Sequence, residues 1–200
     1  MSSANPKQNR RQFLSRTSMA LAAAGAAGLH RPLGADEGPP SQARGGPVIQ
    51  RTLGRTGIKL PIVSMGVMNA NNPDLVQQAY EAGVRLFDTA EGYQQGRNER
   101  MIGDVVARLG IRDKVYIQTK VRLPRAPDGE MKAAVLAGAA GCLERLQTSY
   151  VDVLMIHQPT VEQMNHPEVL VALKELKQRK TARFIGVSTH TNQAGVLRNA

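Results

Sequence analysis

The sequence predicts an α/β protein of the (β/α)8 barrel type, in which about five of the eight βα units are present. From residue 61 onward, short apolar segments alternate with longer amphipathic ones. The apolar segments end at residues 88, 120, 157 and 188, intervals of 31 to 37 residues, which is the length of a strand, a crossover helix and two loops. Because no Gly-x-Gly-x-x-Gly turn follows any strand, a dinucleotide-binding doubly wound sheet is disfavoured relative to the barrel.

A small hairpin is expected first, over residues 51–60, with its turn at Gly54–Gly57. Residues 61–66 read as a buried strand. Further strands are expected at 85–88, 115–120, 151–157 and 184–188. Because these segments are almost continuously apolar, we expect a parallel sheet covered on both faces.

Helices are expected between the strands, each with apolar residues at helical spacing. The expected helices span 73–82, 99–109 and 131–146, followed by one that Pro167 opens and one that begins at Asn192 or Gln193 and is not finished. The apolar stripe of the helix after Pro167 is expected to include Leu170, Leu173, Leu176 and Lys177. A complete barrel has eight strands in about 250 residues. We therefore expect residues 51–200 to be the N-terminal part of a barrel whose C-terminal units are missing, and the chain to be a fragment.

The first 35 residues are predicted to be an export signal. Arg10 and Arg11 precede Phe13 and Leu14, and an uncharged Ala/Gly-rich stretch follows at 19–29. This order resembles a bacterial twin-arginine signal, which predicts the export machinery as a partner and a periplasmic location. The alternative is a disordered basic tail. Residues 36–50 read as a flexible linker, and the 11-residue apolar stretch is shorter than the about 20 residues that span a membrane.

Composition excludes several classes of function. The net charge of +10 is scattered along the chain rather than clustered, and only 4% of residues are aromatic, so a nucleic-acid-binding surface is not expected. The single cysteine, Cys142, excludes an intramolecular disulfide and a multi-cysteine metal site. It lies in an Ala-rich helical segment, where a small buried side chain is expected rather than a nucleophile.

Polar residues stand at the ends of the predicted strands. Asp88, Lys120 and His157 each end one strand, and Tyr93 lies in the loop after Asp88. In a (β/α)8 barrel the carboxyl ends of the strands form one rim, where active sites are built. Taken singly, each residue also fits an ordinary structural role; their common position in successive repeats favours a shared site.

Several motifs together resemble the aldo-keto reductase superfamily. They are Phe87-Asp88-Thr89-Ala90-x-x-Tyr93, Thr119-Lys120, Asp152-x-x-x-Ile156-His157-x-Pro159 and Gly186-Val187-Ser188, with Leu53-Gly54-x-Thr56-Gly57 and Asn98-Glu99-x-x-Ile102-Gly103. The resemblance covers about residues 51–195. It implies reduction of an aldehyde or ketone to an alcohol with NADPH, and a catalytic tetrad of Asp88, Tyr93, Lys120 and His157. In these roles Tyr93 gives the proton, Lys120 favours its release, Asp88 holds Lys120, and His157 orients the carbonyl oxygen.

The resemblance also suggests cofactor-binding positions. These are Gly66, Val67 and Met68 after the first strand, Asp88, and Ser188 with Thr189 after the last one. Thr189 replaces the usual Asn, Val67 replaces a usual Thr, and Gln158 stands where many members have Trp, which suggests a more polar substrate pocket. In the family, the residues that contact the cofactor's phosphates and adenine belong to later strands. NADPH is therefore expected from the resemblance alone, and NADH stays an alternative.

Two readings of function stay open. The first is an exported reductase of a small carbonyl compound; an iron–sulfur centre is conceivable only in a missing C-terminal part. The second is a nicotinamide-binding regulatory or redox-sensing protein on the same barrel, without significant turnover. A truncated product that does not fold is the third possibility.

Overall fold

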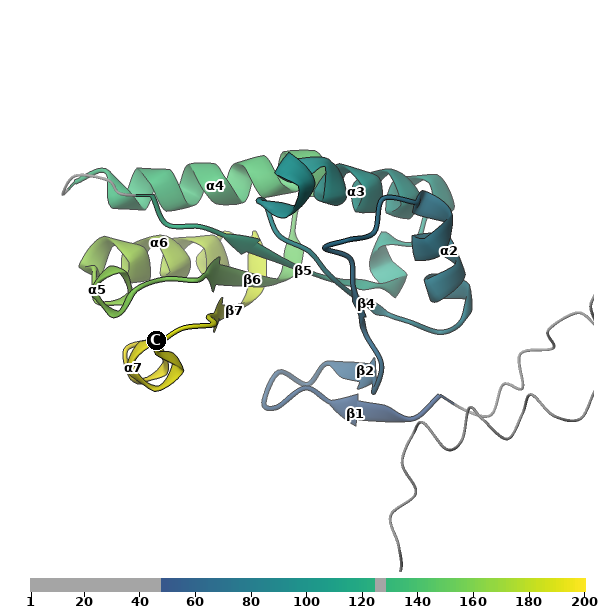
Figure 1. Ribbon diagram of the computed structural model, residues 1–200, viewed down its shortest axis with the longest axis horizontal. Helices are drawn as coiled ribbons and strands as arrows, with labels where there is room; N and C mark the ends of the chain where they lie inside the picture. Colours follow the sequence, from purple (N-terminus) through teal and green to yellow (C-terminus); the bar gives the residue numbers. More distant parts are fainter. Residues whose placement is uncertain (1–47, 125–128) are drawn as a thin grey trace, which may run out of the picture. The chain divides into compact units, whose positions relative to one another are not determined.

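The computed structural model describes residues 48–124 and 129–200, and their core is a five-stranded parallel sheet. Its strand order, β3-β4-β5-β6-β7, is the order of the strands in the chain (Figure 1). The strands are β3 (Met65–Gly66), β4 (Leu86–Asp88), β5 (Tyr116–Val121), β6 (Val151–His157) and β7 (Ala182–Ser188). The predicted α/β architecture is confirmed. The predicted signal (residues 1–35) and almost all of the predicted linker (36–50) lie outside the described residues.

A short antiparallel hairpin precedes the sheet, as predicted. It pairs β1 (Gln50–Thr52) with β2 (Lys59–Pro61). Gly54 and Gly57 adopt positive φ angles of 49° and 73°, which side chains other than glycine rarely tolerate. The hydroxyl of Thr56 accepts a hydrogen bond from the amide of Ile58 at 3.1 Å and so stabilises the turn.

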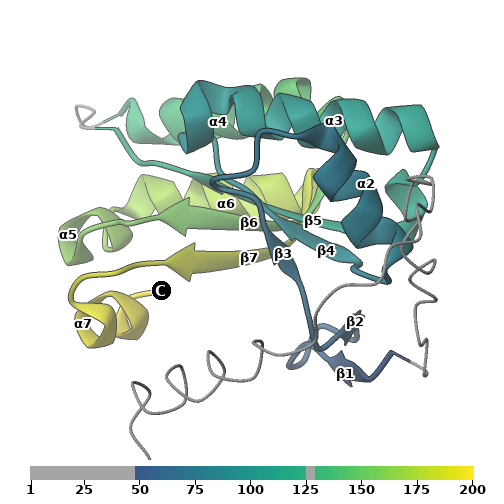
Figure 2. The same cartoon turned by 45° about the vertical axis from the view of Figure 1, so that its right-hand side comes forward.

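A helix follows each strand of the parallel sheet, and the four longest helices pack beside one another in chain order. They are α2 (Pro73–Glu81), α3 (Arg97–Leu109), α4 (Met131–Leu146), α5 (Val161–Met164), α6 (Pro167–Gln178) and α7 (Gln193–Arg198), with 3-10 turns at Tyr93–Gly96 and Arg112–Lys114. In both views α2, α3 and α4 lie along one side of the sheet (Figures 1 and 2). None of the helices in the described part of the chain combines the length and apolarity needed to cross a bilayer.

The core lies between the helices and one face of the sheet. Alternate strand residues point to this face, and Phe87, Ile117, Leu154 and Ile156 are fully buried there. At the contact between α3 and α4, a Cβ on Gly103 would stand 2.8 Å from the backbone of Leu146. Only glycine therefore permits the close approach of these two helices.

The other face of the sheet is only half-buried, so the prediction of two covered faces is wrong for the described residues. Residues such as Tyr116, Gln118 and Met155 alternate with the core residues and stay partly exposed. The apolar strand sequences reflect packing against helices on one side. On the other side they line the inner surface of the curved sheet.

Several predicted elements differ from the structure. The predicted single strand over residues 61–66 is divided: Pro61 ends β2 of the hairpin, and only Met65–Gly66 joins the parallel sheet. Ile62 and Val63 lie between the two strands and are 59% and 62% exposed, and β3 is an edge strand that pairs only with β4. In α6 the buried positions include Val169 and Ala172, whereas Leu170 is exposed. The structure also contains α5, which was not predicted, and α7 ends at Arg198.

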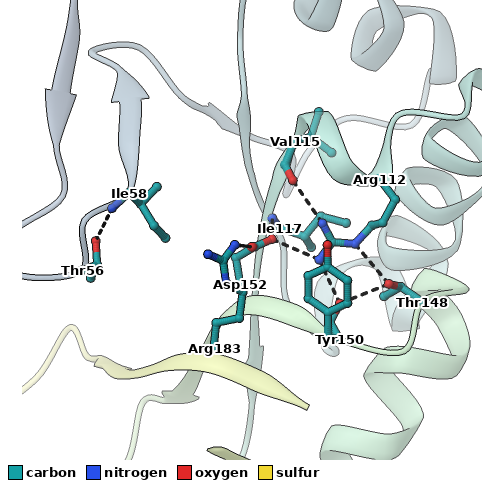
Figure 3. A network of polar contacts seen from close by, with 9 residues as sticks. All are labelled: Thr56, Ile58, Arg112, Val115, Ile117, Thr148, Tyr150, Asp152 and Arg183. Atoms are coloured by element: carbon teal, nitrogen blue, oxygen red, sulfur yellow. Dashed lines mark hydrogen bonds and ion pairs between the residues drawn. The ribbon is translucent and has the colours of Figure 1, made fainter. Parts of the chain in front are cut away.

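The amino ends of the strands are held together by a buried carboxylate (Figure 3). Asp152, 1% exposed, accepts hydrogen bonds from Arg112 at 3.0 Å, Arg183 at 2.7 Å and the amide of Ile117 at 2.9 Å. Arg112 also lies 3.9 Å from the ring centroid of Tyr150. This network joins β5, β6 and β7 at the amino end of the sheet.

Candidate active site

Lys120 is the centre of the candidate site. It stands near the end of β5, is only 4% exposed, and its Nζ lies 2.6 Å from Asp88 Oδ1 and 2.8 Å from the carbonyl oxygen of Thr89. The phenolic oxygen of Tyr93 is 3.3 Å away from the same nitrogen. A buried ammonium is tolerated only when it is paired and hydrogen-bonded, and these contacts satisfy all three of its donors.

Tyr93 is positioned by the loop that follows β4. Its amide donates to the carbonyl of Ala90 at 3.0 Å, and the 3-10 turn Tyr93–Gly96 starts at this residue. Its ring meets the imidazole of His157 edge to face, with centroids 5.9 Å apart and an interplanar angle of 85°. Lys120 Nζ is 4.9 Å from the ring centroid and therefore lies closer to the hydroxyl than to the ring.

His157 ends β6 and is 5% exposed. Burial lowers the pKa of His157, and the positive charges of Lys120 and Arg122 lower it further. The imidazole is therefore neutral at neutral pH and offers one N–H and one lone pair. Its Nδ1 is buried and has no hydrogen-bond partner among the described residues. Because no described residue binds Nδ1, no hydrogen bond at this atom decides which ring nitrogen carries the proton.

Asp88 is held by a second donor besides Lys120. The side-chain amide of Gln118 donates to the same oxygen, Oδ1, at 2.6 Å. Gln118 is the register partner of Asp88 in the neighbouring strand and points to the same face as Lys120 two residues later. The carboxylate is therefore fixed in direction from β5 by two side chains.

The loops around the site are connected by Asn98, at the start of α3. Its amide nitrogen donates to the carbonyls of Val67 at 2.6 Å and Ala70 at 3.0 Å, and its oxygen accepts the hydroxyl of Thr89 at 2.8 Å. Asn98 thus joins the loop after β3 to the loop after β4. The carbonyl of Thr89, in turn, binds Lys120.

Beneath the site, a buried carboxylate fixes β5 to two helices. Glu99 of α3 accepts the hydroxyl of Thr119 at 2.5 Å and the guanidinium Nε of Arg145 at 2.6 Å. Cys142 lies beside this group and is fully buried, as predicted, and burial raises the pKa of its thiol well above the ordinary value. Thr119 precedes Lys120, so this network sets the position of the strand that carries the ammonium.

The predicted cofactor residues are not all in one place. Gly66 and Met68 line a hollow of about 580 Å³ with Tyr93 and His190, and a Cβ on Gly66 would meet no atom within 4 Å. The side chain of Val67 is buried away from this hollow and only its backbone takes part in contacts around the site.

Ser188 and Thr189 follow at the end of β7. Ser188 is paired in register with His157, and none of the described residues hydrogen-bonds its hydroxyl. The hydroxyl of Thr189 donates to the carbonyl of Thr191 at 2.8 Å and accepts the Thr191 amide at 3.3 Å, so it is occupied within its own loop.

Sequence reasoning placed Asp88, Tyr93, Lys120 and His157 on one rim, and the structure brings these four together. It missed Gln118, Asn98 as a connector, and Arg122 at the end of β5. Gln118 could have been found, since the period of a strand puts it on the same face as Lys120. Nothing in the sequence showed that Asn98 would reach the loop after β3.

The parallel α/β sheet, with polar side chains gathered at the carboxyl ends of its strands, is that of a barrel-type protein. The model of the Aldo/keto reductase family matches residues 63–200. The chain therefore belongs to the aldo/keto reductase family.

Relatives and solved structures agree with this assignment. The chain is 36% identical over 132 residues to an aldo-keto reductase of Mycolicibacterium smegmatis, a match that covers 64% of this chain and 44% of the relative. It is similar to the holo form of the aldo-keto reductase AKR11C1 from Bacillus halodurans, with 28% identity, a TM-score of 0.61, and coverage of 70% and 50%.

An aldo/keto reductase from Klebsiella pneumoniae, solved in complex with NADP and acetate, shares the fold with 23% identity, a TM-score of 0.61 and coverage of 72% and 52%. The chain spans about half the length of the curated relatives it matches.

Proposed function

We propose that the protein is an NADPH-dependent oxidoreductase that reduces an aldehyde or ketone to an alcohol, with Tyr93 as the general acid. The observation that supports this most directly is the position of Lys120 Nζ, 2.6 Å from Asp88 and 3.3 Å from the phenolic oxygen of Tyr93. A phenol, an ammonium and a neutral imidazole around one point form the set of groups that carbonyl reduction needs.

Each group has a distinct task. Bound NADPH would supply the hydride that reduces the carbonyl carbon. Tyr93 gives its proton to the carbonyl oxygen as negative charge develops there, and Lys120 stabilises the resulting phenolate. His157 presents its N–H to the same oxygen and orients the carbonyl. Asp88 keeps Lys120 charged and in place, and Gln118 fixes the direction of Asp88.

The residues around the hollow fit a nicotinamide. Gly66 leaves space at the end of β3, and Met68 offers an exposed apolar side chain. Ser188 does not line the hollow; it ends β7 in register with His157, where its hydroxyl could bind a carboxamide. The NADP in the Klebsiella pneumoniae structure supports the choice of cofactor. In binding the cofactor, Val67 would take part through its backbone. Thr189 would help only by shaping its loop, because its hydroxyl is already hydrogen-bonded to Thr191.

Tyr93→Phe tests the proposal. Removing one hydroxyl deletes the proton donor and keeps the ring against His157, so turnover of an aldehyde should fall by about 100- to 10,000-fold. NADPH consumption measures the rate, and the change in NADPH fluorescence on titration measures binding, which should be retained. Tyr80→Phe, on α2, is the matched control and should keep full activity.

Undiminished turnover in Tyr93→Phe would refute the assignment of the acid. A wild-type protein that binds NADPH and reduces no aldehyde or ketone in a broad panel would instead favour the regulatory or redox-sensing reading.

A further inference from the structure

Arg122 and Gln158 form a polar pair at the rim that the reduction itself does not require. Arg122 follows the last residue of β5 and Gln158 follows His157, so both stand one position beyond neighbouring strands. The Arg122 Nη2 donates to Gln158 Oε1 at 3.3 Å, and both side chains are exposed. The pair is therefore next to the imidazole and open to solvent.

The backbone amides of both residues are fixed by hydrogen bonds. The amide of Arg122 donates to the carboxylate of Glu91 at 2.5 Å. Gln158 has a φ of 55°, a left-handed conformation that residues other than glycine rarely adopt, and its amide donates to the carbonyl of Ser188 at 2.6 Å. Such a strained residue directly after a site histidine suggests a functional reason for its direction.

The pair has unused donors, and its guanidinium forms no direct ion pair with a carboxylate of the described residues. The Gln158 oxygen is occupied by Arg122, which leaves its NH₂ free, and further guanidinium N–H groups of Arg122 have no partner among the described residues. No described carboxylate lies within ion-pair distance of this guanidinium. Asp88 is engaged by Lys120, and the bond of Glu91 goes to the backbone of Arg122.

We propose that Arg122 and Gln158 bind an anionic group, a carboxylate or a phosphate, on the carbonyl substrate. This inference rests on the proposed function. A guanidinium and an amide present N–H donors that match the oxygens of such a group, and hydrogen bonds between charged partners are the stronger ones. The preferred substrates are then aldehydes or ketones that carry a negative charge at a distance from the carbonyl.

A pair of substrates that differ only in charge tests this. The wild-type protein should reduce 4-carboxybenzaldehyde with a higher kcat/KM than its neutral methyl ester. In Arg122→Met the kcat/KM for the acid should fall by about 10-fold or more, the size expected for a lost charged hydrogen bond. The value for the ester should stay the same.

The control is a second exposed Arg–Gln pair, which joins two helices and does not stand at the strand ends. Arg108 donates to Gln77 at 3.0 Å between the exposed surfaces of α3 and α2, and Arg108→Met should change neither substrate. The ratio of kcat/KM for glyceraldehyde 3-phosphate to that for glyceraldehyde measures the gain from a phosphate. Comparing this ratio with the ratio for the acid and its ester shows whether a phosphate is preferred over a carboxylate. The KM for NADPH should not change in Arg122→Met; a change there alone would assign the pair to the cofactor and overturn the proposal.

Binding is measured separately from turnover, by saturation-transfer NMR of 4-carboxybenzaldehyde and its ester. Weaker binding of the acid alone to Arg122→Met supports the anion site even if no substrate is reduced, in which case the proposed function fails and the site stands. Equal loss for acid and ester, or no loss for either, refutes the anion site and leaves the reductase intact.

Discussion

The two ends of the parallel sheet use similar side chains for different purposes. At the amino end, the carboxylate of Asp152 is bound by Arg112, Arg183 and the amide of Ile117, and it is almost inaccessible (Figure 3). At the carboxyl end, Asp88 and Lys120 also pair at 2.6 Å. Beside that pair, however, lies an imidazole nitrogen without a partner.

The difference lies in what is left for a ligand. A carboxylate whose oxygens are all occupied stabilises the fold and offers nothing more, whereas a site with spare donors and acceptors can bind and react. Pairing of charges alone therefore does not identify an active site. Incomplete hydrogen bonding around a buried pair is the better sign.

The largest expected effect on stability comes from breaking the amino end. Asp152→Ala removes the carboxylate that binds both Arg112 and Arg183 and leaves the buried amide of Ile117 without an acceptor. The free energy of unfolding should therefore fall by about 3–5 kcal/mol. Urea denaturation followed by circular dichroism measures this. The control Glu175→Ala removes surface ion pairs with Lys132 and Arg179 and should lower the free energy of unfolding far less, because such pairs are screened by solvent.

Tyr93→Phe completes the comparison, because it should greatly lower activity while lowering the free energy of unfolding less than Asp152→Ala does. It removes one long contact of Lys120 and leaves the contacts with Asp88 and Thr89. If Asp152→Ala and Glu175→Ala had the same free energy of unfolding, the network at the amino end would not be what stabilises the fold.

Much of the fold could be predicted because periodicity and turn residues agree along the chain. The predicted bounds of α4 and β6 coincide with the structure. Edge position was not predictable in the same way: residues 61–66 are mostly apolar, yet only Met65 and Gly66 join the parallel sheet, while Pro61 pairs in the hairpin. The buried face of α6 was displaced because both Val169 and Leu170 are apolar, and only packing decides between neighbours.

The positions of the main site residues were predictable, but the contacts that hold the loops around them were not. The common position at strand ends placed Asp88, Lys120 and His157 on one rim before any distance was known. Contacts such as Asn98 with Val67, 31 residues apart, depend on the paths of two loops. The turn that occupies the hydroxyl of Thr189 also depends on loop geometry, which composition and spacing do not encode.

Gln118→Leu sharpens the comparison at the rim with a smaller effect. It removes the amide that directs Asp88 and keeps a side chain of similar size, so kcat should fall by about 3- to 10-fold with little change in the KM for NADPH. Gln77→Leu, which removes an exposed Gln–carboxylate contact to Glu81 on α2, is the matched control and should leave kcat unchanged. Equal kcat values for wild type and Gln118→Leu would show that Lys120 alone positions the carboxylate.

The smallest expected effect is on the pH dependence of stability, through the buried imidazole of His157. Burial lowers the pKa of His157 below the ordinary 6.5, so the folded protein takes up its proton less readily than the unfolded chain does. The stability that depends on neutral His157 is present above about pH 6.5 and is lost as the pH falls toward the lower pKa of the folded state. Melting temperatures measured between pH 7.5 and 5 should therefore decline less steeply in His157→Gln than in the wild type. Parallel curves would mean that His157 titrates alike in both states, and that the rim is as fully satisfied as the amino end.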